Sequence, residues 1–99
     1  MNPVANNETV ALSSRVRHRA VDKDGVLVHL DNGRVIIVNE VGLYIVQLLT
    51  RPMTHAQLIE AVAAEFEVSN QQAASDLDQF LGELGNEQLL GPAAGPPEN

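Results

Sequence analysis

The side chains of this sequence that can transfer a proton or bind a metal ion form no catalytic pattern. There is no cysteine, and the three histidines, His18, His29 and His55, lack the spacing of a zinc motif. Asp76 and Asp78 stand two positions apart, so on a helix they point in different directions and form no close carboxylate pair. No serine has a paired base in a recognisable motif, and no glycine-rich phosphate loop is present. We therefore expect no catalytic residue, no metal and no cofactor, which favours a protein that is not an enzyme.

The charge of the chain is unevenly distributed. The formal net charge is −7, and all six Lys and Arg residues lie within residues 1–51, together with five acids. Residues 52–99 hold eight acids and no Lys or Arg, so helices in this half would repel the phosphates of DNA. The strands carry a small basic group, which we interpret as a solvated sheet face: Arg15, Arg17, Arg19 and Arg34. We expect no nucleic-acid partner.

Length and composition indicate one small domain with polar ends. With 99 residues the chain is long enough for one modest core. Residues 1–13 show no sustained pattern and are predicted to form a flexible N-terminal arm, and residues 91–99, which hold three of the five prolines, a disordered C-terminal tail. The folded domain is therefore predicted over residues 14–90.

No segment predicts a membrane-spanning helix. No stretch approaches the roughly 18 consecutive apolar residues that cross a bilayer. The first residues lack the basic start and the apolar block of a secretion signal. We expect a soluble, cytoplasmic protein with no membrane partner.

Three short strands are predicted in the first half of the chain. Residues 15–21 alternate Arg with other residues, residues 26–30 read "VLVHL", and residues 34–38 contain four consecutive branched aliphatics. Between the last two strands, Asn32 and Gly33 are predicted to form a two-residue type I′ turn.

This turn sets an expected register and an expected core face. Leu30 would lie opposite Val35, and Leu27 opposite Val38. One sheet face is then entirely apolar and the other is mixed, so we expect the apolar face to be buried. The predicted core face consists of Val26, Val28, Leu30, Val35 and Ile37.

Three helices follow the strands. Asn39 is predicted to cap the first, which runs to about Leu49 before Pro52. A capping box is predicted at residues 54–57, "THAQ", where the second helix begins. A second capping box is predicted at residues 69–72, "SNQQ", where the third helix begins. The predicted fold is α+β and winged-helix-like, with a three-stranded antiparallel sheet followed by three helices.

The last strand is an edge without the usual protection. Proteins guard edge strands with charge, proline or bulges, and Val35–Val38 carry no charge, proline or glycine. One interpretation is that the chain's own helices or a dimer mate cover this strand. The other is that the edge stays open and receives an extended peptide as an additional strand.

The segment "LVHLDNGRVIIVNEVGLYIVQLL…MTHAQLIEAVAAEFEVSNQQAASDLDQFLGELGNEQLL" resembles the PqqD-like family over about residues 16–90. These are recognition elements for precursor peptides that are made on the ribosome and then modified, as in pyrroloquinoline quinone and lasso peptide biosynthesis. The resemblance implies a non-catalytic winged-helix domain. It would bind the leader of the precursor by strand addition and present it to a maturation enzyme, such as a radical SAM enzyme or a leader peptidase.

The same resemblance implies which residues contact the peptide. The third strand would line it, with third-helix residues opposite. From the residues alone, Phe80 lies at the margin of the apolar stripe of the third helix, where it would either join the core or form the floor of a peptide pocket. Val46 stands where relatives often carry tryptophan, so the resemblance does not assign the chain to one biosynthetic pathway. The predicted peptide-binding residues are Val35, Ile36, Ile37, Val38, Gln72, Asp76, Gln79 and Phe80.

An alternative remains from the residues alone. A small homodimeric winged-helix adaptor or transcriptional regulator would pair the exposed strand with its own copy. A peptide carrier would instead be a monomer or a weak dimer.

Overall fold

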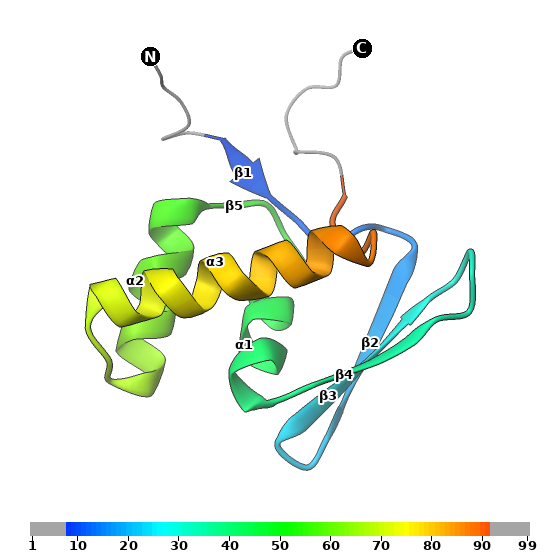
Figure 1. Ribbon diagram of the computed structural model, residues 1–99, viewed down its shortest axis with the longest axis horizontal. Helices are drawn as coiled ribbons and strands as arrows, with labels where there is room; N and C mark the ends of the chain where they lie inside the picture. Colours follow the sequence, from blue (N-terminus) through cyan, green and yellow to red (C-terminus); the bar gives the residue numbers. More distant parts are fainter. Residues whose placement is uncertain (1–7, 92–99) are drawn as a thin grey trace.

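A three-stranded antiparallel sheet, in the order β2–β3–β4, lies beside a group of three helices in the computed structural model, which describes residues 8–91 (Figure 1). A further two-stranded pair joins β1 to β5. The predicted α+β class and the strand order are confirmed. The elements are β1 Thr9–Val10, β2 Val16–Val21, β3 Asp24–His29, β4 Val35–Val38, α1 Glu40–Leu48, β5 Met53–Thr54, α2 His55–Phe66 and α3 Asn70–Asn86.

The tight turn of the sheet lies between β2 and β3 rather than between β3 and β4. Val21 pairs with Asp24, so residues 22–23 alone connect the two strands, and Asp22 adopts a positive φ of 56°. Asp tolerates this left-handed backbone better than most residues.

The connection between β3 and β4 is a longer loop, so the predicted two-residue turn and its register are wrong. Leu27 lies opposite Ile36, not Val38. The His29 N–H donates to the Arg34 carbonyl at 3.0 Å, which leaves residues 30–33 as the loop. Asn32 uses its side-chain oxygen to accept from the Arg34 N–H at 2.9 Å. Such a local bond from an Asn side chain competes with the strand ladder and lengthens the turn.

The buried face of the sheet is also opposite to the predicted one. Leu27 is fully buried and Val38 is 8% exposed, whereas Val35 and Ile37 are 59% and 66% exposed. A Cβ at Gly25 would lie 2.8 Å from the Leu43 side chain, so α1 packs closely on the Leu27 side of the sheet. The grouping of residues by face is right, because a register shift of two positions preserves it.

All three predicted N-cap residues cap their helices, but the second capping box, predicted at residues 69–72, is incomplete because the Gln72 side chain donates to Asp76 instead. The Asn39 side chain accepts from the Gly42 N–H at 2.9 Å, and Thr54 and Gln57 form the reciprocal capping box. Ser69 accepts from the Gln72 N–H at 3.0 Å. These bonds satisfy amides that the first turn of a helix leaves unpaired.

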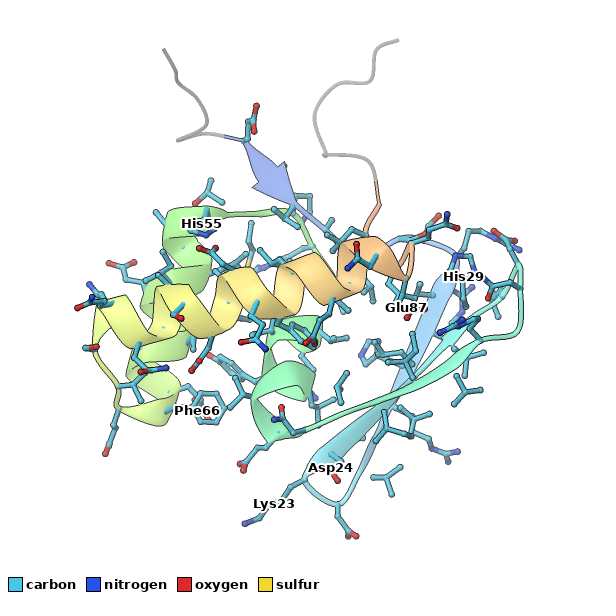
Figure 2. The ribbon with its side chains drawn as sticks, in the orientation of Figure 1. Lys23, Asp24, His29, His55, Phe66 and Glu87 are labelled. Atoms are coloured by element: carbon cyan, nitrogen blue, oxygen red, sulfur yellow. The ribbon has the colours of Figure 1, made fainter. Side chains whose placement is uncertain are left out.

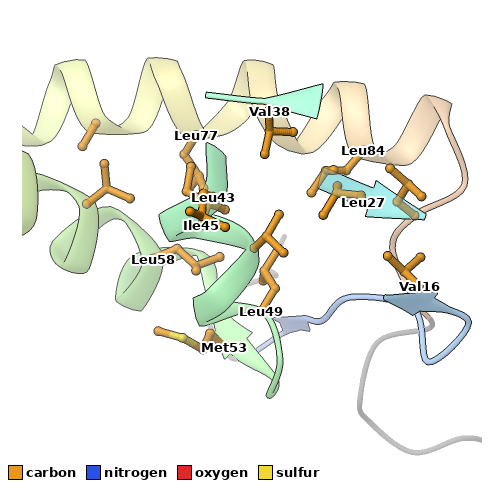
Figure 3. Packing of buried hydrophobic residues seen from close by; sticks show 14 residues of the cluster. Val16, Leu27, Val38, Leu43, Ile45, Leu49, Met53, Leu58, Leu77 and Leu84 are labelled. Atoms are coloured by element: carbon orange, nitrogen blue, oxygen red, sulfur yellow. The ribbon is translucent and has the colours of Figure 1, made fainter. Parts of the chain in front are cut away.

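The core lies between the sheet and the helices (Figure 3). α3 packs along α2, and its last turns approach the sheet (Figure 1). Side chains from strands and helices meet in one apolar cluster, in which Leu27, Ile45, Leu49, Leu58 and Leu77 are fully buried.

Part of the predicted N-terminal arm belongs to the fold. Val10 pairs with Met53, and Leu12 forms a bridge with Leu90. The arm was expected over residues 1–13, so its last residues are corrected to structured chain. Residues 1–7 and the predicted tail from residue 92 onward lie outside the described part. Within residues 8–91, no helix combines the length and the apolar character that crossing a membrane requires.

Candidate functional site

β4 is the outer strand of the sheet, and its hydrogen-bond pattern shows which backbone groups are free. The His29 N–H donates to the Arg34 carbonyl, which marks this pair as a hydrogen-bonded one. Bonded and non-bonded pairs alternate along an antiparallel ladder. Ile36 and Val38 therefore direct their N–H and C=O groups toward β3.

Val35 and Ile37 direct their backbone groups away from the sheet. The pairing of β3 with β2 is consistent with this pattern. The Leu30 N–H donates to the Arg15 carbonyl at 2.8 Å, so successive residues along β3 bond alternately to β2 and to β4. Within residues 8–91, no backbone group of β4 bonds to any strand, loop or helix other than β3. The edge of β4 is therefore open in the described chain.

A groove of about 740 Å³ lies beside this edge, between β4, the start of α1 and one face of α3. Its floor is largely apolar. It is lined by Ile36, Ile37, Val38, Asn39, Val41, Gly42, Asp76, Gln79, Phe80, Glu83, Leu84, Asn86, Glu87 and Leu89.

Gly42 gives the floor of the groove its close packing. A Cβ at this position would lie 2.9 Å from the Phe80 ring and 2.9 Å from the Val38 Cβ. The absent side chain lets α1, β4 and α3 approach one another at one point. Phe80 is half-buried there, with part of its ring facing the groove.

The structure brings six of the eight predicted site residues together around this groove. Ile36, Ile37 and Val38 come from β4, and Asp76, Gln79 and Phe80 from α3. The other two, Val35 and Gln72, do not line it. Val35 lies on the outer sheet face, although its backbone groups are on the open edge, and Gln72 donates from Nε2 to Asp76 Oδ1 at 2.9 Å.

Sequence reasoning missed two carboxylates of the groove, Glu83 and Glu87. Glu83 lies on the same face of α3 as Asp76, and Glu87, the residue directly after α3, lines the same groove; their spacing from Asp76 matches the helical repeat. The signal was therefore present in the spacing of acids along the third helix. Their neighbour Leu84 also lines the groove and is buried.

The polar part of the groove is acidic. Asp76, Glu83 and Glu87 line it, and no Lys or Arg does so. Arg34 reaches Glu87 from outside the lining, with Nη2 2.7 Å from Oε1. Figure 2 shows Glu87 at the end of α3 that lies near the sheet. The His55–Asp78 pair, at 2.6 Å, ties α2 to α3 away from the groove. Within residues 8–91, no three His, Cys, Asp or Glu side chains lie close enough together to hold a metal ion.

Comparison with known proteins assigns the chain to a family. The family model described as "Coenzyme PQQ synthesis protein D (PqqD)" matches residues 24–90. The chain belongs to the PqqD family. The resemblance predicted from the sequence is thereby confirmed. No curated protein matches significantly.

Two solved structures share the PqqD-family fold of this chain. TbiB1, solved in complex with the TbiA(beta) leader peptide, is 30% identical, with a TM-score of 0.74 over 89% of this chain and 99% of TbiB1. The PqqD truncation of Methylobacterium extorquens PqqCD, described as a functional stand-alone RiPP recognition element, is 15% identical, with a TM-score of 0.72 over 91% of this chain and 96% of that one. The second likeness concerns the fold alone.

Proposed function

We propose that this chain is a non-catalytic recognition element that binds the leader segment of a ribosomally made precursor peptide. The leader adds as a strand to the open edge of β4 and lies in the groove against α3. The single observation that carries this proposal is the direction of the Val35 and Ile37 backbone groups. They offer two N–H donors and two C=O acceptors to an incoming strand, in the geometry of an antiparallel or parallel ladder.

The side chains of the groove would supply selectivity. A strand added to β4 alternates its side chains between the two sheet faces. Those on the inner face would meet Ile36, Val38 and Phe80, which form apolar floor, and the polar residues of α3. The backbone bonds then provide sequence-independent affinity, and the groove reads alternate leader residues.

The comparison with TbiB1 supports this proposal, because that protein was solved with a leader peptide. We further propose a partner enzyme: the domain would present its bound leader to a maturation enzyme, such as a radical SAM enzyme or a leader peptidase.

The test is a selection of random-sequence peptides on the immobilised protein, with two variants at one position. Ile37→Pro removes an N–H that points away from β3, so the sheet keeps its ladder while the incoming strand loses a donor. Ile37→Ala keeps this N–H and removes only a side chain that is 66% exposed. We expect the wild type and Ile37→Ala to retain peptides and Ile37→Pro to retain few.

Equal retention by Ile37→Pro would overturn strand addition at β4, provided that circular dichroism shows both variants folded. A homodimer that pairs β4 with its own copy would use the same backbone groups. Light scattering separates the two states, because the carrier is expected near its monomer mass of 10.7 kDa and the dimer near twice that mass.

A further inference from the structure

The groove has two walls of different chemistry. The β4 and α1 side is apolar, apart from Asn39. The α3 side presents three carboxylates and two amides, contributed by Asp76, Gln79, Glu83, Asn86 and Glu87. A peptide strand in this groove would therefore meet an apolar floor and an acidic wall.

The chain leaves most of this negative charge uncompensated. Of the three groove carboxylates, Glu87 alone has a basic partner within residues 8–91, and this partner is Arg34. Asp76 accepts a hydrogen bond from the neutral amide of Gln72, and Glu83 makes no ion pair or side-chain hydrogen bond with any described residue. Carboxylates beside an apolar, partly enclosed space interact with a cation more strongly than carboxylates in open water do. The same wall would repel an acidic peptide.

The positions of the carboxylates along α3 set a spacing. Asp76 and Glu83 are separated by about 10 Å along the axis, because each helical residue rises about 1.5 Å. Phe80 lies between them on the same face. Inner-facing residues of an extended peptide recur about every 6.6 Å, so three in succession span about 13 Å. The flexible side chains of Lys and Arg accommodate the difference between the spacing of the two carboxylates and that of the peptide residues.

We infer that the leader read by this groove is basic, with Lys or Arg at positions i and i+4 and an apolar residue at i+2. The two cations pair with Asp76 and Glu83, and the apolar residue packs on Phe80. This inference rests on the proposed function, since it requires a peptide strand along β4. It assigns Asp76 and Glu83 as specificity-determining residues.

The experiment sequences the random peptides retained by the wild type, by Asp76→Asn/Glu83→Gln and by Glu60→Gln/Glu65→Gln. The second pair lies on exposed positions of α2 outside the groove and changes the net charge equally. Asn at position 76 keeps an acceptor for Gln72. We expect enrichment of Lys and Arg at i and i+4 for the wild type and the α2 variant, and loss of this enrichment, with peptides still retained, for the groove variant.

Affinity then checks the pairing for one selected peptide. Replacing each of its two basic residues by Gln is expected to weaken binding about five-fold, as for a partly exposed ion pair. Retained peptides without basic enrichment, or enrichment that persists in the groove variant, would overturn the charge assignment while strand addition stands. If the wild type retains no more peptide than Ile37→Pro does, the proposed function fails and the inference fails with it.

Discussion

Arg34 Nη2 lies 2.7 Å from Glu87 Oε1, which joins the residue before β4 to the residue after α3 at one end of the groove. The two side chains are 57% and 36% exposed. Solvent screens such a pair, so its contribution to the free energy of unfolding is small. A double-mutant cycle with Arg34→Gln and Glu87→Gln, measured by urea unfolding, is expected to give a coupling of about 0.5 kcal/mol.

A coupling above about 2 kcal/mol would contradict this, since values of that size belong to buried or networked pairs. The Arg34→Gln protein alone should also favour basic peptides more than the wild type does, because Glu87 then becomes a third unpaired carboxylate in the groove.

Gly42→Ala tests the close packing at the groove floor. The new methyl group would meet Phe80 and Val38 at 2.9 Å, so one of them must move. We expect a loss of about 1–3 kcal/mol in the free energy of unfolding. Gly82→Ala is the matched control, because nothing lies within 4 Å of its Cβ position and Gly82 is in the interior of α3.

The control variant should be stabilised by about 0.5–1 kcal/mol through helix propensity. If Gly42→Ala behaves like Gly82→Ala, the contact among α1, β4 and α3 is looser than described. The groove would then be wider at Phe80.

Leu27→Ala and Val26→Ala test which face of the sheet is buried. Leu27 is fully buried, so its truncation leaves a cavity and should cost about 2–5 kcal/mol. Val26 is half-exposed on the other face, and its truncation should cost less than about 1.5 kcal/mol. Chemical denaturation of both variants gives the comparison, and a larger loss for Val26→Ala would restore the face predicted from the sequence.

Ser69→Ala tests the cap that begins α3. The Ser69 hydroxyl accepts from the Gln72 N–H at 3.0 Å, so its removal should cost about 1 kcal/mol. Ser75→Ala, at an exposed position inside the same helix, should be neutral or slightly stabilising, because Ala is the better helix former. The midpoint of thermal unfolding is measured for both variants. Equal shifts for Ser69→Ala and Ser75→Ala would contradict the stabilising role of the cap.

Local chemistry explains why much of the fold was predictable. Asn39, Thr54 and Ser69 begin their helices as expected, because a capping side chain needs only the amides of the next turn. The lack of protection at this edge was also predicted, since Val35–Val38 carry no charge, proline or glycine, but the sequence left both an open edge and a covered edge possible.

The buried face and the register depended on distant parts of the chain. One face of the β3–β4 hairpin is entirely apolar and the other, which carries His29, is mixed, so composition favoured the wrong face. The choice follows from where α1 packs, with Leu43 over Gly25. The register follows from bonds at the loop, where Asn32 accepts from Arg34 and the Asp31 N–H donates to His29 Nδ1. Neither set of contacts shows in the hydrophobic pattern.

The candidate site was predicted more completely on β4 than on α3. The resemblance placed Ile36, Ile37 and Val38 beside the peptide, and their run of aliphatics marks the strand, whereas the α3 wall requires knowing which helical face turns toward the sheet. Extending the repeat from Asp76 would have reached Glu83 and Glu87. Gln72 lies one helical turn before Asp76, near the start of α3, and this end of the helix is far from β4 (Figure 1).

The central claim is that the Val35 and Ile37 amides are free and pair with the incoming strand, and hydrogen exchange followed by NMR measures this directly. In the free protein, these two amides should exchange fast, while those of Ile36 and Val38 are protected by β3. A selected peptide at saturation should slow exchange at Val35 and Ile37 by at least about tenfold, equivalent to about 1.4 kcal/mol. Protection of these two amides in the free protein, or no change on binding, would contradict the account.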